Sequence, residues 1–173
     1  MTQLIGLVGH IGAGKSEVAR ILSDRCGFVR FKFAYKLKRM LKDLGLTSRE
    51  IEGDLKEKPC ALLGGRTPRH AMITLGTEWG RNMIDPDLWV RATMHDVDTS
   101  AWGSSFVFDD VRFPNEAAAI IARGGVIWRV VRPTIASIHA AHESEDGQSA
   151  IRASRVICND GSLAELEREV LGL

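Results

Sequence analysis

Apolar residues near the start of the chain form a short run that a glycine-rich stretch follows. Residues Leu4 to Val8 are apolar except for one glycine. Beyond the glycine-rich stretch, Val18, Ile21 and Leu22 recur at the spacing of one helix face. The pattern predicts a buried strand, then a loop, then a helix.

The order of strand and helix recurs along the rest of the chain. Apolar runs predict four more strands, at Phe28–Phe33, at Phe106–Phe108 with Val111, at Val126–Val131 and at Arg155–Cys158. Apolar stripes at helical spacing predict helices at Ala34–Leu44, Ala117–Ala122 and Ser162–Leu171. Alternating strands and helices are typical of parallel sheets with right-handed crossovers. We therefore expect an α/β fold, with a five-stranded parallel sheet and helices on both faces.

Composition limits what the chain binds. Its 173 residues, 45% of them hydrophobic and 26% charged, suit a single packed domain over residues 1–173. The net charge of +1 gives no overall excess to hold a polyanion such as free nucleic acid. Three widely spaced cysteines argue against a disulfide framework and a zinc site. No apolar stretch approaches the roughly 18 residues that span a bilayer, so we expect no membrane partner and a cytoplasmic location.

Residues Gly9 to Ser16 match the phosphate-binding motif G-x-x-x-x-G-K-[ST] between a predicted strand and a predicted helix. Glycines let backbone N–H groups turn around phosphates, while Lys15 reaches the β- and γ-phosphate oxygens and the Ser16 hydroxyl ligates Mg²⁺. The alternative is a chance glycine-rich turn. We expect a site for ATP and Mg²⁺, with Asn159 beside the adenine. The expected ATP-binding residues are Gly9, Ile11, Gly12, Ala13, Gly14, Lys15, Ser16, Glu17 and Asn159.

Motors, switches, hydrolases and kinases share such a motif, and two segments favour a kinase. Residues 47–91 contain helical pieces broken by proline and glycine, and predict an insertion that binds the phosphoryl acceptor. Residues 132–154 are polar and predict a lid. Arg129 and Arg132, at the strand end where this lid begins, either neutralise the transferring phosphoryl group or are simply solvated. A kinase closes over two ligands because water would otherwise accept the phosphoryl group.

Acidic residues follow the third predicted strand, at the sheet edge where α/β proteins bind ligands. We expect Asp110 to hold Mg²⁺ or to orient the attacking oxygen of the acceptor, and Arg112 to bind phosphate. The two residues lie two apart, so they share a face if the chain stays extended. Alternatively, Asp109 and Asp110 form a turn and cap the next helix. Which aspartate is functional stays open at this point.

The predicted insertion carries arginine and tryptophan, the residue types that bind nucleotides. Arg69 and Arg81 are candidates for clamping a monophosphate, and Trp79 and Trp89 for stacking on a base. A tryptophan is otherwise a core residue. The pattern predicts a nucleotide as acceptor.

Two blocks are more specific than the phosphate-binding motif: Leu75-Gly76-Thr77-Glu78-Trp79-Gly80-Arg81 and Asp110-Val111-Arg112-Phe113-Pro114-Asn115-Glu116. Further blocks lie at 33–38, 66–69, 87–89, 142–145 and 159–162. Together these blocks span nearly the whole chain. In them the chain resembles the bacteriophage deoxynucleoside-monophosphate kinase family.

The resemblance implies a kinase that forms deoxynucleoside diphosphates from monophosphates (dNMP) with ATP and Mg²⁺. It also implies an adenylate-kinase-like core, a homodimer, and the host cytoplasm if the protein is phage-encoded. The expected catalytic residues are Lys15, Asp110, Arg112 and Arg132, and the expected metal ligands are Ser16 and Asp110. The expected substrate-binding residues are Lys36, Arg69, Trp79, Arg81, Trp89, Asp110, Arg112, Glu116 and Glu145.

Other acceptors remain open on the residues alone. The same phosphate-binding motif serves kinases of other small acceptors, such as phosphomevalonate or dephospho-coenzyme A, and a modified base within DNA is a further possibility. A non-enzymatic NTP-dependent switch is the alternative from a different class. The preferred base, the discrimination between deoxyribose and ribose, and the oligomeric state are not fixed by the sequence.

Overall fold

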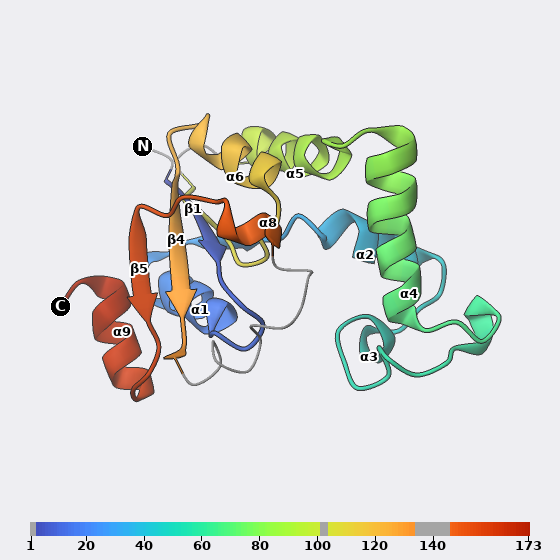
Figure 1. Cartoon of the computed structure of the whole chain (residues 1–173), viewed down its shortest axis with the longest axis horizontal. Coiled ribbons are helices and arrows are strands. Elements are labelled where there is room, and N and C mark those ends of the chain that lie inside the picture. The colour runs from blue at the N-terminus through green and yellow to red at the C-terminus, as the bar shows by residue number, and fades with distance from the viewer. Residues whose placement is uncertain (1–2, 101–103, 134–145) are drawn as a thin grey trace. The chain divides into compact units, whose positions relative to one another are not determined.

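The computed structural model describes residues 3–100, 104–133 and 146–173. Contacts within the chain divide it into two compact units. Unit 1 comprises Met1–Lys32 and Val97–Leu173, and unit 2 comprises Phe33–Asp96. Unit 1 therefore holds the phosphate-binding motif, and unit 2 holds the whole insertion, residues 47–91, that the sequence predicts to bind the acceptor (Figure 1).

Unit 1 is built on a five-stranded parallel sheet in the order β2-β3-β1-β4-β5. The strands are β1 (Leu4–Val8), β2 (Val29–Phe31), β3 (Phe106–Phe108), β4 (Val126–Val131) and β5 (Arg155–Cys158). In the central strand, Gly6 lies opposite Phe108 of β3 and Ile127 of β4. All carboxyl ends meet at one edge of the sheet, and the α/β fold predicted from the sequence is confirmed.

Helices cover both faces of this sheet. They are α1 (Lys15–Cys26), α6 (Pro114–Ile121) and α9 (Leu163–Leu171), while the short α8 (Asp146–Ser149) lies between β4 and β5 along the chain. On one face, Val18 of α1 and Leu166 of α9 pack with Leu7 and Val130 in the main core. On the other face, α6 lies so close to β1 that a Cβ atom on Gly6 would come within 2.8 Å of Ile120. Burial on both faces explains why every residue of β1 is buried.

Two predicted strands are longer than the observed ones. The strand predicted at Phe28–Phe33 covers only Val29–Phe31, and the strand predicted to include Val111 ends at Phe108. Val111 is fully buried outside the ladder, because apolar patterning reports burial rather than strand pairing. Asp110 and Arg112 therefore lie beyond the strand, and their placement on one face of an extended chain stays a prediction.

Unit 2 is helical. It contains α2 (Tyr35–Asp43), α3 (Ser48–Ile51), the 3₁₀ helix η1 (Ala61–Leu63), α4 (Pro68–Ile73), the π-helix η2 (Thr74–Ile84) and most of α5 (Leu88–Thr99). A small core of Leu41, Leu46 and Ile51 packs against side chains of α4 and η2. The helix α5 continues to Thr99, past residue 91, where the sequence predicted the insertion to end.

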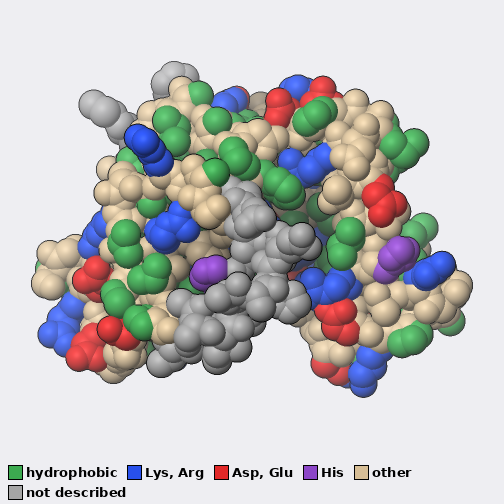
Figure 2. Space-filling model, in the orientation of Figure 1, with side chains coloured by type: hydrophobic (Ala, Val, Ile, Leu, Met, Phe, Trp, Pro, Cys, Tyr) green, Lys and Arg blue, Asp and Glu red, His purple; other side chains and the backbone are tan. Residues whose placement is uncertain are grey.

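The surface mixes charges of both signs. On the face drawn in Figure 2, Lys and Arg side chains are interspersed with Asp and Glu side chains. None of the helices in the described ranges combines the length and apolar content needed to cross a bilayer. All three cysteines are free thiols.

Candidate active site

The phosphate-binding loop joins the buried strand β1 to α1 at the carboxyl edge of the sheet. Gly9 and Gly14 have φ values of 145° and 104°, which side chains on L-residues rarely allow. Neighbouring atoms also leave no room for a side chain at either position. A Cβ atom on Gly9 would lie 2.2 Å from the Val130 carbonyl oxygen, and one on Gly14 would lie 2.3 Å from Asn159 Nδ2. Glycine at both positions is therefore required by conformation and by packing.

The Asn159 side chain fixes the end of this loop. Its Nδ2 donates a hydrogen bond of 2.9 Å to the Ala13 carbonyl oxygen. Asn159 follows β5, and its own backbone N–H donates to Val131 at the end of β4. The fifth strand thus positions the loop at the start of α1, where the unpaired N–H groups and the positive end of the helix dipole attract an anion.

Lys15 bends back over the loop. Its Nζ donates to the carbonyl oxygens of Gly9 and His10. Burial, and next the charge of Arg112, lower the pKa of Lys15 to about 8, whereas Asp109 and Asp110 act in the opposite direction. Arg112 and both aspartates therefore lie close enough to Lys15 to act on its charge. An anion that binds here restores favourable interactions to the ammonium group.

Ser16 and Glu17 lie in the first turn of α1. The Ser16 side chain is exposed, whereas Glu17 pairs with Arg20 one turn later. The hydrogen bond from Arg20 lowers the pKa of Glu17. The Glu17 backbone N–H bonds Gly14 in the first turn. Glu17 therefore contributes its charge to the helix surface, and Ser16 presents the hydroxyl nearest the loop.

The two aspartates after β3 differ in their surroundings. The Asp109 side chain is 1% exposed, with Oδ2 at 2.7 Å from Arg30 Nη2 and Oδ1 at 3.8 Å from Lys32 Nζ. Asp110 is only half-buried. Neither aspartate caps α6, because Phe113 is the N-cap residue and Glu116 supplies the capping carboxylate. The helix-cap alternative for these aspartates is therefore wrong.

Glu116 supports the backbone beside Arg112. It is 2% exposed, and its Oε2 accepts hydrogen bonds from Arg112 N at 2.7 Å and Phe113 N at 3.1 Å. The Arg112 side chain itself is exposed. The segment from Asp110 to Glu116 thus presents a half-buried acid and an exposed guanidinium beside Lys15, with a buried carboxylate holding the turn.

Unit 2 has an open cavity of about 700 Å³ between α2, η2 and α5. Its lining combines apolar and aromatic side chains with cations and one acid. The lining residues are Lys36, Arg39, Met40, Asp43, Trp79, Leu88, Trp89, Arg91, Ala92 and His95. Aromatic rings together with cations suit a flat, anionic ligand of nucleotide size.

The two tryptophans of this cavity have different roles. Trp89 is 4% exposed, its Nε1 donates to the Gly76 carbonyl oxygen at 2.8 Å, and Gly80 lies directly against its ring. Trp79 is 37% exposed, and the two rings are 6.2 Å apart at an angle of 50°. Trp89 is therefore the packed partner, and Trp79 has the accessible ring.

Lys36 lines the cavity and forms an ion pair of 2.7 Å with Asp96. Arg69 and Arg81 are not among the lining residues. Arg69 forms an ion pair with Glu57, and Arg81 donates to the Pro86 carbonyl oxygen at 3.2 Å. The structure thus gathers Lys36, Trp79 and Trp89 at one cavity and leaves the two arginines on neighbouring surface.

A family model described as deoxynucleotide monophosphate kinase matches residues 66–170. A protein of Acanthamoeba polyphaga mimivirus, whose name assigns it to the same kind of kinase, is 35% identical over 182 residues. That match covers 97% of this chain and 94% of the viral protein. The chain belongs to the deoxynucleotide monophosphate kinase family. It is an ATP-dependent nucleotide kinase, which excludes the non-enzymatic switch.

Solved structures share the fold of this family member. A Thermus thermophilus protein has a TM-score of 0.54 at 21% identity, with 99% of this chain and 95% of that chain covered. Shikimate kinase from Aquifex aeolicus has a TM-score of 0.50 at 14% identity, with coverage of 97% and 93%. These likenesses concern the fold alone.

The predicted lid of this kinase is only partly visible. Glu145 and the block 142–145 lie outside the described residues, and Arg132 is exposed after β4. Arg129 is not a solvated lid arginine, because its Nη2 donates to the carbonyl oxygens of Gln148 and Ile151 at 3.0 and 2.7 Å. Its position inside β4 directs it to the neighbouring backbone rather than to solvent.

Residues that sequence reasoning missed also contact the site. Arg30 and Lys32 hold Asp109, and Gln148 Oε1 accepts a hydrogen bond of 2.9 Å from the Gly9 backbone N–H. Alternating cations in the second strand were a visible signal for the first pair. A polar residue that bonds to a glycine 139 positions away leaves no signal in the sequence.

Proposed function

We propose that the protein transfers the γ-phosphoryl group of ATP to the phosphate of a deoxynucleoside monophosphate, giving the diphosphate and ADP. An oxygen of the acceptor phosphate attacks the γ-phosphorus, and the bond between that phosphorus and the oxygen bridging to ADP breaks. The observation that carries this proposal is the glycine loop with Lys15 at the start of α1, in a chain of this kinase family.

In the proposed donor complex, the N–H groups of the loop residues between Gly9 and Glu17 surround the triphosphate, and Lys15 leaves the loop carbonyls for the β- and γ-phosphate oxygens. Arg112 and Arg132 balance charge on the transferring group. Asp110 holds Mg²⁺ through water or orients the attacking oxygen through a water molecule, since a carboxylate repels the anionic oxygen of the acceptor phosphate at direct contact. Asn159 holds the loop and borders the adenine.

The oxygen donors near the loop fit Mg²⁺, which prefers hard oxygen ligands and keeps several from water and phosphate. Across the described ranges, no three His, Cys, Asp or Glu side chains gather as a metal cluster. Ser16 and Asp110 are the proposed protein ligands. Bound there with the nucleotide, Mg²⁺ supplies charge neutralisation to the phosphates.

The proposed acceptor site is the cavity of unit 2. Trp79 stacks on the base, Trp89 supports it from behind, and Lys36 attracts the phosphate. Arg69 and Arg81 are the proposed phosphate clamp, which requires each to exchange its present partner for the ligand. Glu116 acts on the substrate indirectly, because it holds the backbone of Arg112. Glu145 stays a proposed substrate-binding residue.

The reaction is tested by incubating the protein with Mg-ATP and each dNMP, each ribonucleotide and hydroxymethylated analogues, and by resolving the products. Formation of a deoxynucleoside diphosphate and an equal amount of ADP is expected. ADP that forms without a phosphorylated acceptor would contradict the proposal, and products from other small alcohols or phosphates would change the acceptor class.

The lowered pKa of Lys15 makes ATP binding depend on pH. The triphosphate needs the protonated ammonium, so affinity is full below pH 8 and falls as pH rises through that value. We expect the Kd for Mg-ATP to be about tenfold higher at pH 9 than at pH 7. Calorimetric titration at pH values from 7 to 9 measures this Kd. Arg112→Gln should shift the midpoint of this pH dependence to higher pH, and Asp110→Asn should shift it to lower pH. An ATP affinity that stays constant up to pH 9.5 would contradict the assignment of Lys15.

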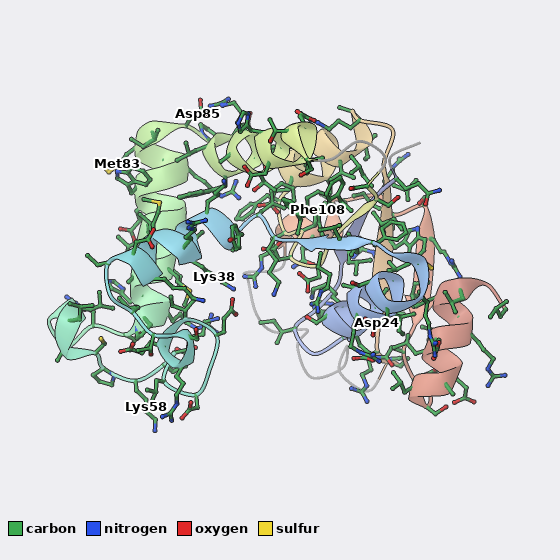
Figure 3. All side chains as sticks on the ribbon, turned by 180° about the vertical axis from the view of Figure 1, so that it is seen from behind. Asp24, Lys38, Lys58, Met83, Asp85 and Phe108 are labelled. Atoms are coloured by element: carbon green, nitrogen blue, oxygen red, sulfur yellow. The ribbon has the colours of Figure 1, made fainter. Side chains whose placement is uncertain are left out.

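The proposed acceptor site predicts that the exposed ring of Trp79 contributes to dNMP binding. Trp79→Ala should raise the KM for dNMP by about tenfold, because stacking of a base on an aromatic ring is worth roughly 1–3 kcal/mol. The KM for ATP should stay within twofold. Met83→Ala is the matched control, since Met83 is exposed on the same helix and does not line the cavity (Figure 3). Equal effects on both nucleotides would remove Trp79 from the acceptor site.

A further inference from the structure

The backbone of Gly9, the first residue of the phosphate-binding loop, is held both at its N–H group and at its carbonyl oxygen. The Gly9 backbone N–H donates to Gln148 Oε1 at 2.9 Å, and the Gly9 carbonyl oxygen accepts from Lys15 Nζ. Gly9 is buried, and its backbone lies directly against Val130 of β4. A buried N–H group needs an acceptor, and here a side chain from α8 supplies it.

Gln148 is itself anchored to the sheet. Arg129 of β4 donates to the Gln148 carbonyl oxygen at 3.0 Å and to the Ile151 carbonyl oxygen at 2.7 Å. Ser154 continues the attachment, with backbone and side chain both bonded to the Ile127 carbonyl oxygen. The segment from Gln148 to Ser154 is therefore fastened to β4 at several points, and the Gln148 amide is presented to Gly9 from a fixed base.

In the proposed donor complex, one of the two contacts on the Gly9 backbone is lost. When Lys15 turns to the triphosphate, the Gly9 carbonyl oxygen loses the ammonium that it bonds here. Gln148 then remains as the described side-chain contact on the Gly9 backbone, at the N–H group of the peptide unit that joins Val8 to Gly9. Since the direction of this peptide unit sets where the loop leaves β1, the contact determines how well the loop N–H groups are aligned for the phosphates.

We propose that Gln148 is a positioning residue for ATP: its side-chain amide, carried by the segment that Arg129 holds, fixes the Gly9 peptide and so keeps the phosphate-binding loop aligned. This inference rests on the proposed function, because it assumes that the loop binds the donor. Gln148 acts through Gly9 and does not take part in the transfer itself.

The test replaces the acceptor with a side chain of similar length, Gln148→Met. Hydrogen exchange of the Gly9 amide should accelerate at least about tenfold, because its partner is lost. The Kd for Mg-ATP should rise about fivefold, the loss expected for one hydrogen bond. The KM for dNMP should stay within twofold, and the melting temperature should stay close to that of the wild type.

A double-mutant cycle with Arg129→Met tests the anchoring. If Arg129 acts through Gln148, the double variant should bind ATP no more weakly than the weaker-binding single variant. Arg152→Met, an exposed arginine in the same segment, is the matched control and should bind ATP like the wild type.

Three results would overturn the positioning role: unchanged Gly9 exchange, ATP affinity within twofold of the wild type, or equal weakening of both nucleotides with a lower melting temperature. Additive effects in the cycle would overturn the anchoring by Arg129. Failure of the wild-type protein to bind Mg-ATP contradicts the proposed function instead, so the two failures are distinguishable.

Discussion

Replacing Lys15 with methionine is expected to reduce kcat by about 10³-fold, a loss of roughly 4 kcal/mol in transition-state stabilisation. Methionine keeps most of the length of the side chain but removes the charge that the developing phosphoryl group needs. Single-turnover measurement with Mg-ATP and dNMP reports the chemical step. The fold should persist, because Lys15 contacts loop carbonyls and is not part of the hydrophobic core.

Stability should even rise slightly in this variant. The folded protein holds Lys15 with its pKa lowered to about 8, which means that the ammonium is disfavoured there relative to the unfolded chain. Lys58→Met, at an exposed lysine of unit 2, is the control for loss of one positive charge (Figure 3). Turnover of Lys15→Met within tenfold of the wild type would reject the assignment of the loop.

The two aspartates after β3 predict opposite outcomes for the same substitution. Asp110→Asn should reduce kcat by about 10²-fold with little change in melting temperature, because the half-buried acid is proposed to face the ligands. Asp109→Asn should instead lower the free energy of unfolding by about 2 kcal/mol, since it breaks the buried end of the pairs with Arg30 and Lys32.

Thermal unfolding and steady-state kinetics of both variants, measured side by side, separate these roles. The matched pair has the same chemistry at adjacent positions, so a general effect of losing a carboxylate would appear in both. If Asp109→Asn abolishes turnover while its melting temperature is unchanged, and Asp110→Asn is active, the functional acid is Asp109 and the assignment is reversed.

Strands with clear boundaries were predictable from the sequence. β1, β4 and β5 begin and end at the predicted residues, because each is an apolar run that turn-forming residues delimit. The loop of Gly9 to Ser16 was predictable for a similar reason, since local glycine chemistry determines it. Its position at the carboxyl edge then follows from the parallel topology.

Contacts between distant segments were not predictable in the same way. The pairing of Asp109 with Arg30 joins residues 79 positions apart, and the cavity of unit 2 depends on how three helices pack. The π-helical geometry of Thr74–Ile84 also has no periodic signal at the usual helical spacing. The homodimer implied by the resemblance stays a prediction, which analytical ultracentrifugation would check.

The cations of β2 have a consequence for the behaviour of the protein at high concentration. β2 is the outermost strand beyond β3, so among the described residues no further strand pairs with the other side of its backbone. An unpaired edge strand can pair with a strand of another molecule and so promote aggregation. Natural proteins oppose this with short edge strands and positively charged side chains. β2 has three residues, with Arg30 within it and Lys32 directly after it. The residues that hold Asp109 thus also keep like-charged copies of this edge apart, and losing them would lower colloidal solubility.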